Sequence, residues 1–139
     1  MAGKAIPRPT PDTQPYWDGA RAGELRVQRC RECGDHYFYP RPFCPHCSSR
    51  DVDWFTASGR GKLHTYVINQ RPAPGFQDYV PYVIAIVELD EGPRMMTNIV
   101  GIDPQPENLP IEMPVEVRWD RQNDDITLPL FRPISSAGA

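Results

Sequence analysis

The 139-residue chain lacks the features of several common protein classes. Its longest apolar run is residues 83–87, followed by Glu88, far short of the roughly 20 residues that cross a membrane as a helix. The first four residues lead into proline and charge, without the apolar segment of a secretory signal. The net charge is −3 and the sequence pI is near 5.6, so the strong positive charge of a general nucleic-acid binder is also absent. These absences predict a cytoplasmic protein that does not enter the membrane.

The sequence also lacks a recognisable catalytic nucleophile. Ser48, Ser49 and Ser58 lie in turn-like segments without the G-x-S-x-G pattern that presents a serine nucleophile. No phosphate-binding P-loop is present. Asp124 and Asp125 are adjacent acids between two expected strands, where a solvated turn is a simpler interpretation than an acid–base pair. We therefore expect the chain alone not to catalyse a reaction.

Only four cysteines are present, arranged as two C-x-x-C pairs that we call the knuckles: Cys30 with Cys33, and Cys44 with Cys47. Four thiolates match the tetrahedral sulfur shell that structural Zn²⁺ prefers. A site closed by four thiolates leaves no open position for water or substrate, so the pattern predicts a structural ion rather than a catalytic one. The ion would fold a segment that contains few large apolar residues.

Zinc is not the only use that two C-x-x-C pairs can have. Two disulfides would require an oxidising compartment, which the absence of a signal segment argues against. A thioredoxin-like redox pair would precede a helix in a βαβ pattern, which this sequence does not show. A rubredoxin-like iron site uses the same four ligands, so iron stays an alternative. Gly34, directly after the first knuckle, suits a tight turn with positive φ, whereas His36 and His46 are expected at the surface or next to the ligands rather than on the ion.

The first 57 residues are typical of an arm and a short helix followed by a metal-bound ribbon. Residues 5–15 are polar and rich in proline, and Thr13 is a candidate N-cap for a helix that ends near Gly23. Residues 25–28 and 52–55 are expected strands on either side of the knuckles. We therefore expect an arm and helix over residues 1–24 and a zinc ribbon over residues 25–57.

From residue 58 the pattern changes to strands. A turn-forming segment, SGRG, occupies residues 58–61. Five segments rich in β-branched and aromatic residues follow, at 62–69, 82–89, 94–100, 115–119 and 126–131. Pro129 predicts that the last is an edge strand, because proline cannot donate a ladder hydrogen bond. Five short strands with almost no helix favour a small barrel, for which the OB-fold is the common solution. The predicted fold is mainly β, with the barrel domain over residues 58–139.

The order of these motifs resembles the DUF35 family, whose members pair a rubredoxin-like zinc ribbon with an OB-fold. The resemblance spans residues 16–133. Its matching segments are Tyr16-Trp17, LRVQRC at 25–30, PRPFCPHC at 40–47, SGRG at 58–61, PGF at 74–76, VPY at 80–82, ELDEG at 88–92 and LPLF at 128–131. One residue departs from the resemblance, because Glu112 stands where this family usually has glycine.

This resemblance implies a connection to acyl-CoA chemistry. Such proteins assemble with thiolase-superfamily enzymes: thiolases, lipid-transfer-protein-like aldolases of steroid side-chain breakdown, and hydroxymethylglutaryl-CoA synthases. They support the catalytic subunit and help to form its CoA channel. By this analogy the channel candidates are Arg71, which would pair with a CoA phosphate, together with Pro74, Phe76 and Tyr79 of the same loop. The alternative is a rigid surface loop that binds no ligand.

Aromatic residues near the knuckles form the candidate partner interface. Tyr16, Trp17 and Phe38, together with Arg41, belong to residue types that interfaces favour. The alternative is that the rings pack on the ribbon itself. A rival function, a zinc-ribbon and OB module that binds single-stranded nucleic acid, is disfavoured because residues 61–139 carry eleven acidic against six basic residues. The sequence thus predicts a non-catalytic subunit that binds a thiolase-like enzyme and meets acyl-CoA only through that complex.

Overall fold

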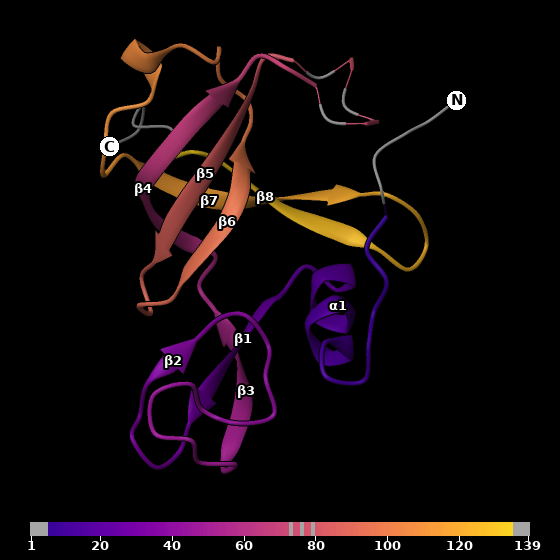
Figure 1. The fold of residues 1–139 in the computed structure, drawn as a ribbon, viewed down its shortest axis with the longest axis vertical. Coiled ribbons are helices and arrows are strands. Elements are labelled where there is room, and N and C mark those ends of the chain that lie inside the picture. The colour runs from indigo at the N-terminus through magenta and orange to yellow at the C-terminus, as the bar shows by residue number, and fades with distance from the viewer. Residues whose placement is uncertain (1–5, 73, 76, 79, 135–139) are drawn as a thin grey trace.

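The computed structural model describes residues 6–72, 74–75, 77–78 and 80–134, which form a ribbon sheet, a barrel and one α-helix beside them (Figure 1). The elements are α1 (Gln14–Arg21), β1 (Leu25–Cys30), β2 (His36–Tyr37), β3 (Val52–Ala57), β4 (Arg60–Asn69), β5 (Tyr82–Leu89), β6 (Arg94–Ile99), the 3-10 helix η1 (Pro106–Asn108), β7 (Pro114–Arg121) and β8 (Thr127–Pro133). Neither helix in these residues has the length and apolar character needed to cross a membrane.

Helix α1 leads directly into the first strand of the ribbon. It tolerates Pro15 in its first turn and ends before Gly23, whose φ of +79° suits glycine. Thr13 does not cap the helix with its side chain, contrary to expectation. Its hydroxyl oxygen instead accepts a hydrogen bond from the Thr10 amide at 2.8 Å, which closes the turn that precedes the helix.

The ribbon is an antiparallel sheet in the order β2-β1-β3. The β1–β3 register runs from Leu25 opposite Ala57 to Cys30 opposite Val52. Since β3 continues almost directly into the barrel strand β4, the Leu25 end of the ribbon lies against the barrel and Cys30 lies at the far end. The strand register therefore places the first knuckle away from the barrel.

The barrel closes in the order β4-β5-β6-β8-β7, which confirms the prediction of a mainly β chain with a five-stranded OB-type barrel. Closure between β4 and β7 is short, from Arg60 opposite Glu116 to Lys62 opposite Pro114. Gly61 lies in this segment, where a side-chain Cβ would overlap the carbonyl oxygen of Glu88. The glycine therefore permits the close approach of β4 to β5 at the point where the barrel closes.

The expectation that Pro129 marks an edge strand is wrong. Strand β8 lies between β6 and β7. Its parallel pairing with β6, however, reaches only Ile99 opposite Phe131. At Pro129 the connection to β6 is made through the proline carbonyl, which accepts a hydrogen bond from the Thr97 hydroxyl at 2.8 Å. Proline is tolerated here because this contact needs an acceptor and no N–H.

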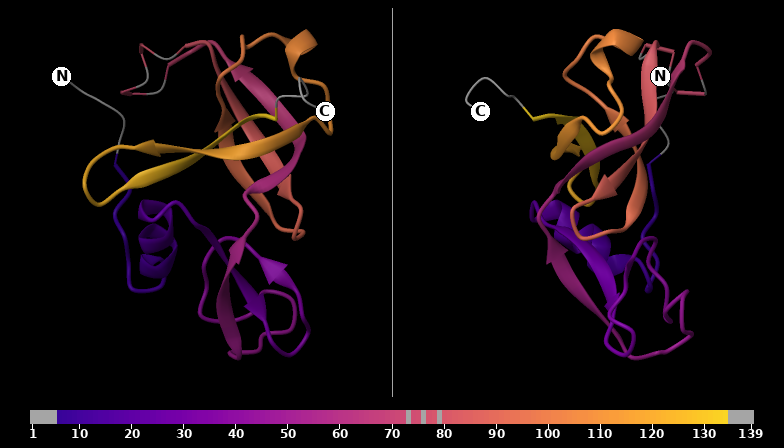
Figure 2. Two further views of the ribbon diagram at one scale, coloured as in Figure 1. Left: turned by 180° about the vertical axis from the view of Figure 1, so that it is seen from behind. Right: turned by 90° about the vertical axis from the view of Figure 1, so that its left-hand side faces the viewer.

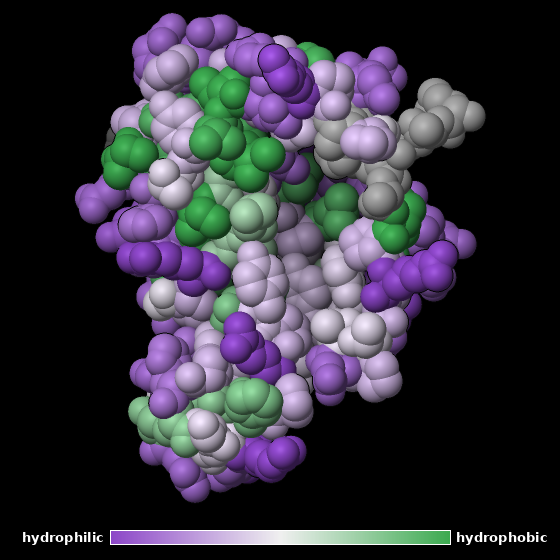
Figure 3. Space-filling model, viewed as in Figure 1, coloured by the Kyte–Doolittle hydropathy of each residue, from purple (hydrophilic) through white to green (hydrophobic). Residues whose placement is uncertain are grey.

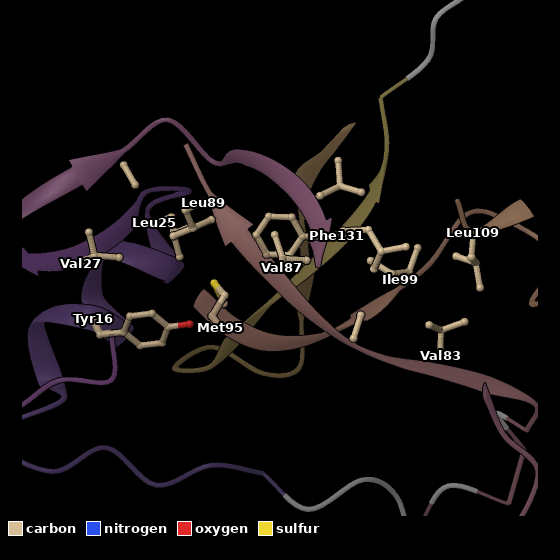
Figure 4. Close-up of a cluster of buried hydrophobic side chains, with 14 residues drawn as sticks. Tyr16, Leu25, Val27, Val83, Val87, Leu89, Met95, Ile99, Leu109 and Phe131 are labelled. Atoms are coloured by element: carbon tan, nitrogen blue, oxygen red, sulfur yellow. The ribbon is translucent and has the colours of Figure 1, made fainter. Parts of the chain in front are cut away.

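One apolar core runs through the ribbon and the barrel. Tyr16 of α1 and Val27 of β1 join Leu89, Met95 and Phe131 of the barrel in a single cluster, and Tyr16 points toward Met95 (Figure 4). Strand β5 supplies this core through strict alternation of buried and partly exposed residues. Each large side chain buried in this way contributes about 1.5–3 kcal/mol. The proximal half of the ribbon and the barrel therefore fold as one unit.

The junction between ribbon and barrel is held by the turn between β5 and β6. The backbone amide of Ser58 donates to the Glu91 carboxylate at 2.7 Å, and the amide of Asp90 donates to the Arg60 carbonyl at 2.9 Å. Helix α1 also packs against both β1 and β8, in the angle between the two modules (Figure 2). These contacts fix the orientation of the ribbon on the barrel.

Candidate metal centre and interface

The two knuckles bring all four thiols together. Their sulfur atoms lie within 4.8 Å of one another, with Cys30 Sγ 3.5 Å from Cys47 Sγ and Cys33 Sγ 3.7 Å from Cys44 Sγ. A tetrahedral ion with Zn–S bonds of about 2.3 Å would set its sulfur atoms about 3.8 Å apart. The spacing therefore fits a four-thiolate ion, as the sequence predicted.

The knuckles have matching backbone geometry. In the first, the amides of Gly34 and Cys33 donate to the carbonyl and the sulfur of Cys30, at 3.0 and 3.4 Å. In the second, the Ser48 amide donates to the Cys44 carbonyl at 2.9 Å, and the His46 amide donates to the Cys44 sulfur at 3.3 Å. The turn that follows each knuckle requires positive φ, which is +79° at Gly34, as expected, and +65° at Ser48.

The electrostatics of the cluster favour a bound cation. The Cys33 amide donates to the Cys30 sulfur and lowers the pKa of that thiol to about 7. At Cys33 the amide of Asp35 lowers the pKa, but burial and the neighbouring sulfurs outweigh it and raise the pKa to about 12. Four negative sulfurs at this spacing repel one another unless a metal ion neutralises them. The donor set thus fits a divalent metal and no further ligand is required.

The two neighbouring histidines have other contacts. The His36 ring meets the Phe55 ring at a tilt of 57° with centroids 4.5 Å apart, and His46 Nδ1 lies 3.9 Å from a carboxylate oxygen of Asp35. Among the described residues, the cluster of possible metal ligands consists of the four cysteines alone. The histidines therefore lie beside the site, as the sequence indicated.

The aromatic residues proposed as a partner interface are not equally accessible. Tyr16 is only 6% exposed, and burial raises the pKa of its phenol. Its ring meets Trp17 edge-on at 4.9 Å and Phe38 at 5.3 Å, and both of these rings pack partly against the core. Tyr16 is therefore mostly buried within the chain, which agrees with the alternative given above, and its place in a partner interface stays a prediction. Trp17 and Phe38 are half-buried, and Arg41 is exposed.

A groove of about 390 Å³ lies where these rings meet the barrel. It is bounded by α1, residues 38–40, β6 and β8, and this face of the molecule is hollowed near its centre (Figure 3). We call it the aromatic groove. The described residues that line it include Trp17, Phe38, Tyr39 and Met96 and carry no charged side chain. Its chemistry suits an apolar, uncharged surface.

Two side chains on the rim of the aromatic groove were missed by sequence reasoning. Tyr39 is 48% exposed and Met96 is 58% exposed. They meet across the ribbon–barrel junction, where the amide of Met96 donates to the Tyr39 hydroxyl at 3.1 Å. No local pattern links residues so far apart in the chain. The available signal was the pair of consecutive methionines in this strand: alternation directs one of the two outward, and methionine is common at adaptable binding surfaces.

The loop proposed to approach acyl-CoA lies at the end of the barrel opposite the ribbon (Figure 1). Arg71 and Pro74 are exposed, and the Arg71 amide donates to the Asn69 side-chain oxygen at 3.3 Å. Phe76 and Tyr79 lie outside the described residues. A smaller pocket of about 220 Å³ lies close to the end of this loop and includes Pro81. The structure therefore separates the loop from the metal centre and does not bring the two candidate sites together.

Comparison with known proteins identifies the family. Residues 17–53 match the model described as the ChsH2 rubredoxin-like zinc ribbon domain, and residues 54–120 match the ChsH2 C-terminal OB-fold domain. A DUF35 domain-containing scaffold protein of Pyrococcus furiosus is 35% identical over 86% of this chain and 90% of its own length. A probable enoyl-CoA hydratase alpha subunit of Thermomonospora curvata is 41% identical over 91% of this chain, which spans only 40% of that relative.

A solved structure gives the same assignment. A chain of the Ltp2-ChsH2(DUF35) aldolase is 40% identical to this one, with a TM-score of 0.78, over 91% of this chain and 98% of that one. Ribbon, barrel and their order are thus shared along almost the whole length. The chain belongs to the DUF35 family, with a zinc ribbon and OB-fold of the ChsH2 type.

Proposed function

We propose that this chain is a non-catalytic subunit that binds and supports a thiolase-superfamily acyl-CoA enzyme, of the thiolase, steroid side-chain aldolase or hydroxymethylglutaryl-CoA synthase type. The observation that carries the proposal is the likeness, over nearly the full length, to the DUF35 chain of an aldolase assembly. The Pyrococcus relative, described as a scaffold protein, agrees with a supporting role.

The site chemistry agrees with a role without catalysis. All four thiols of the chain converge on one cluster, so none is left as a nucleophile for thioester chemistry. We propose Zn²⁺ as the resident ion and retain iron as the alternative, because both metals accept four thiolates. Reduced thiols of this kind suit a cytoplasmic protein. The ion would hold the ribbon in shape and would not contact substrate.

Two surfaces of the chain would have different roles in the complex. The aromatic groove, with Trp17 and Phe38 and the nearby Arg41, would contact the catalytic subunit. The loop with Arg71, Pro74, Phe76 and Tyr79 would lie near the acyl-CoA entrance of the complex. A ribbon that is already rigid loses little conformational entropy on docking, which favours the first assignment. The second rests on the family analogy and on the exposure of Arg71.

Purification from the native host tests the proposal directly. A tagged chain should retain a thiolase-superfamily polypeptide, identified by mass spectrometry. The chain alone should have no turnover with acyl-CoA thioesters, and the reconstituted complex should be active. Recovery of a hydratase polypeptide instead would favour a second candidate function, a subunit of an enoyl-CoA hydratase, which the description of the Thermomonospora relative suggests. Recovery of nucleic acid, or robust turnover by the chain alone, would refute the subunit proposal.

A further inference from the structure

The loop between the knuckles is tied to the metal centre at both ends. Residues 34–43 begin directly after the ligand Cys33 and end directly before the ligand Cys44. Inside the ribbon, the buried Gln28 side chain accepts a hydrogen bond from the Arg41 amide at 2.6 Å. The Tyr37 hydroxyl also donates to the Arg41 carbonyl at 3.3 Å. The path of this loop is therefore set by the ribbon and its ligands.

The same loop reaches the barrel on its other side. The Phe38 ring lies 5.3 Å from Tyr16 and 4.4 Å from Tyr39, measured between centroids. The Tyr39 hydroxyl accepts the hydrogen bond of the Met96 amide at 3.1 Å. On the edge of β6 that carries the Met96 amide, pairing with β8 is confined to Ile99. The Tyr39 hydroxyl therefore accepts the hydrogen bond that the carbonyl of a neighbouring strand would otherwise accept. Residues 38–40 thereby form one wall of the aromatic groove.

The two ends of this connection differ in what stabilises them. Around the metal centre the buried apolar cluster is small, with Cys30, Tyr37 and Cys44 at its centre and Val52 packed against it. Two of these three central residues are metal ligands, so loss of the ion would leave little apolar burial to order the distal ribbon. The barrel, in contrast, keeps the large core that it shares with the helix and the proximal half of the ribbon. Metal loss should therefore loosen the loop and leave the barrel folded.

We propose that residues 38–40 form a metal-dependent strap, held on the barrel through Tyr39 and Met96 only while the four-thiolate site is loaded. The metal centre and the wall of the aromatic groove are then one linked equilibrium. Loss of the ion opens the groove without unfolding the barrel. If the aromatic groove binds the catalytic subunit, metal occupancy also controls assembly. This consequence rests on the proposed function. The strap itself is a property of the isolated chain.

Amide hydrogen exchange of the full chain, followed by NMR before and after removal of Zn²⁺ with a chelator, tests the strap without any partner. The Met96 amide should exchange at least about tenfold faster in the metal-free chain. The amides of Leu63 and Leu89, which donate to carbonyls within the barrel, should change by less than about threefold. The Tyr39→Phe variant keeps the ring and lacks the hydroxyl, so its Met96 amide should exchange fast even with Zn²⁺ bound.

The matched control is Phe43→Ala, which removes an aromatic side chain of the same loop that is 40% exposed and does not line the aromatic groove. With Zn²⁺ bound, this variant should keep the slow exchange of Met96. Unchanged Met96 exchange after metal removal would overturn the proposal. So would an equal loss of protection at Leu63 and Leu89, because the effect would then be global unfolding. Neither result depends on whether a catalytic partner exists, so the strap and the proposed function fail separately.

Discussion

At the scale of single residues, two non-glycine positions among the described residues adopt a backbone conformation that favours glycine. Ser48 has φ of +65° and Glu112 has φ of +70°. Glu112 is held there by its neighbours, because its amide donates to the Leu63 carbonyl at 2.7 Å and the Leu63 amide donates to the Met113 carbonyl at 2.9 Å. This positive φ explains why glycine is the usual residue of the DUF35 family at the position that Glu112 occupies here.

Replacement of Glu112 by glycine should stabilise the chain. The left-handed conformation costs a non-glycine residue about 1–2 kcal/mol, part of which the greater entropy of glycine in the unfolded state offsets. The ion pair that is lost, Glu112 with Lys62 at 3.9 Å, is exposed and contributes little. We expect the free energy of unfolding from urea titration to rise by about 1 kcal/mol. Glu112→Ala removes the same carboxylate and keeps the strain, so an equal gain in this control would contradict the explanation.

At the scale of elements, closure of the barrel depends on Gly61. Its neighbour at the overlap is the backbone carbonyl of Glu88, which cannot move without disturbing the β4–β5 pairing. Gly61→Ala should therefore destabilise the chain by 2 kcal/mol or more, on the order of other strained core changes. Gly19→Ala is the comparison, because the atoms that it would meet belong to the half-buried side chain of Arg26, which can shift at a smaller cost than a backbone carbonyl within a strand pair. Thermal unfolding of both variants measures the difference, and equal tolerance would contradict this account of barrel closure.

The stability of the ribbon should depend on its bound metal ion. Elemental analysis of purified chain should find one metal ion per chain, and Cys44→Ser should lose it and lower the stability of residues 25–55. His46→Ala changes a neighbouring side chain that the structure leaves out of the ligand set, so this variant should keep the full metal content. A folded, reduced wild-type sample with much less than one ion per chain would show that the site is not a resident metal centre.

Local patterns predicted most elements and missed the contacts made across the fold. The helix was expected from Thr13 to about residue 22 and is Gln14–Arg21, and the alternation of residues 82–89 is that of a half-buried strand. The two C-x-x-C pairs predicted the metal cluster, because two thiols three residues apart in a tight turn lie close enough to bind one ion. The position of β8 was predicted wrongly, and the sequence left open whether Tyr16 lies at an interface or packs within the chain. Both are set by pairing and packing between residues distant in the chain, which no window of the sequence contains.

At the scale of the whole molecule, one shared core holds two separate surfaces in a fixed relation. The aromatic groove lies at the ribbon–barrel junction, and the loop with Arg71 lies at the opposite end of the barrel (Figure 1). The turn with Asp90 and Glu91 locks the junction. A rigid chain of this shape can touch a catalytic subunit at one place and approach its channel at another, which is what a supporting subunit of the proposed kind requires.

Arg71→Ala should leave assembly with the catalytic subunit intact and raise the KM of the complex for acyl-CoA. The physical reason is the loss of an exposed guanidinium able to pair with a CoA phosphate. The assay uses reconstituted complex at saturating subunit concentration, with Arg118→Ala as a control that removes an exposed arginine from β7. If KM for acyl-CoA is the same in both variants, Arg71 does not contact the substrate.

The aromatic groove can be tested as the partner interface with two equally exposed apolar residues. Met96 on the groove rim is 58% exposed and Ile111, which does not line the groove, is 57% exposed. Lysine at either position stays solvated in the free chain, so neither variant should change its unfolding temperature much. On binding, Met96→Lys would bring a charge into an uncharged apolar contact, and the Kd for the catalytic subunit should rise about tenfold or more. Ile111→Lys should bind like the wild type in the same titration. Equal affinities for both variants would place the interface elsewhere on the molecule and leave the aromatic groove without this role.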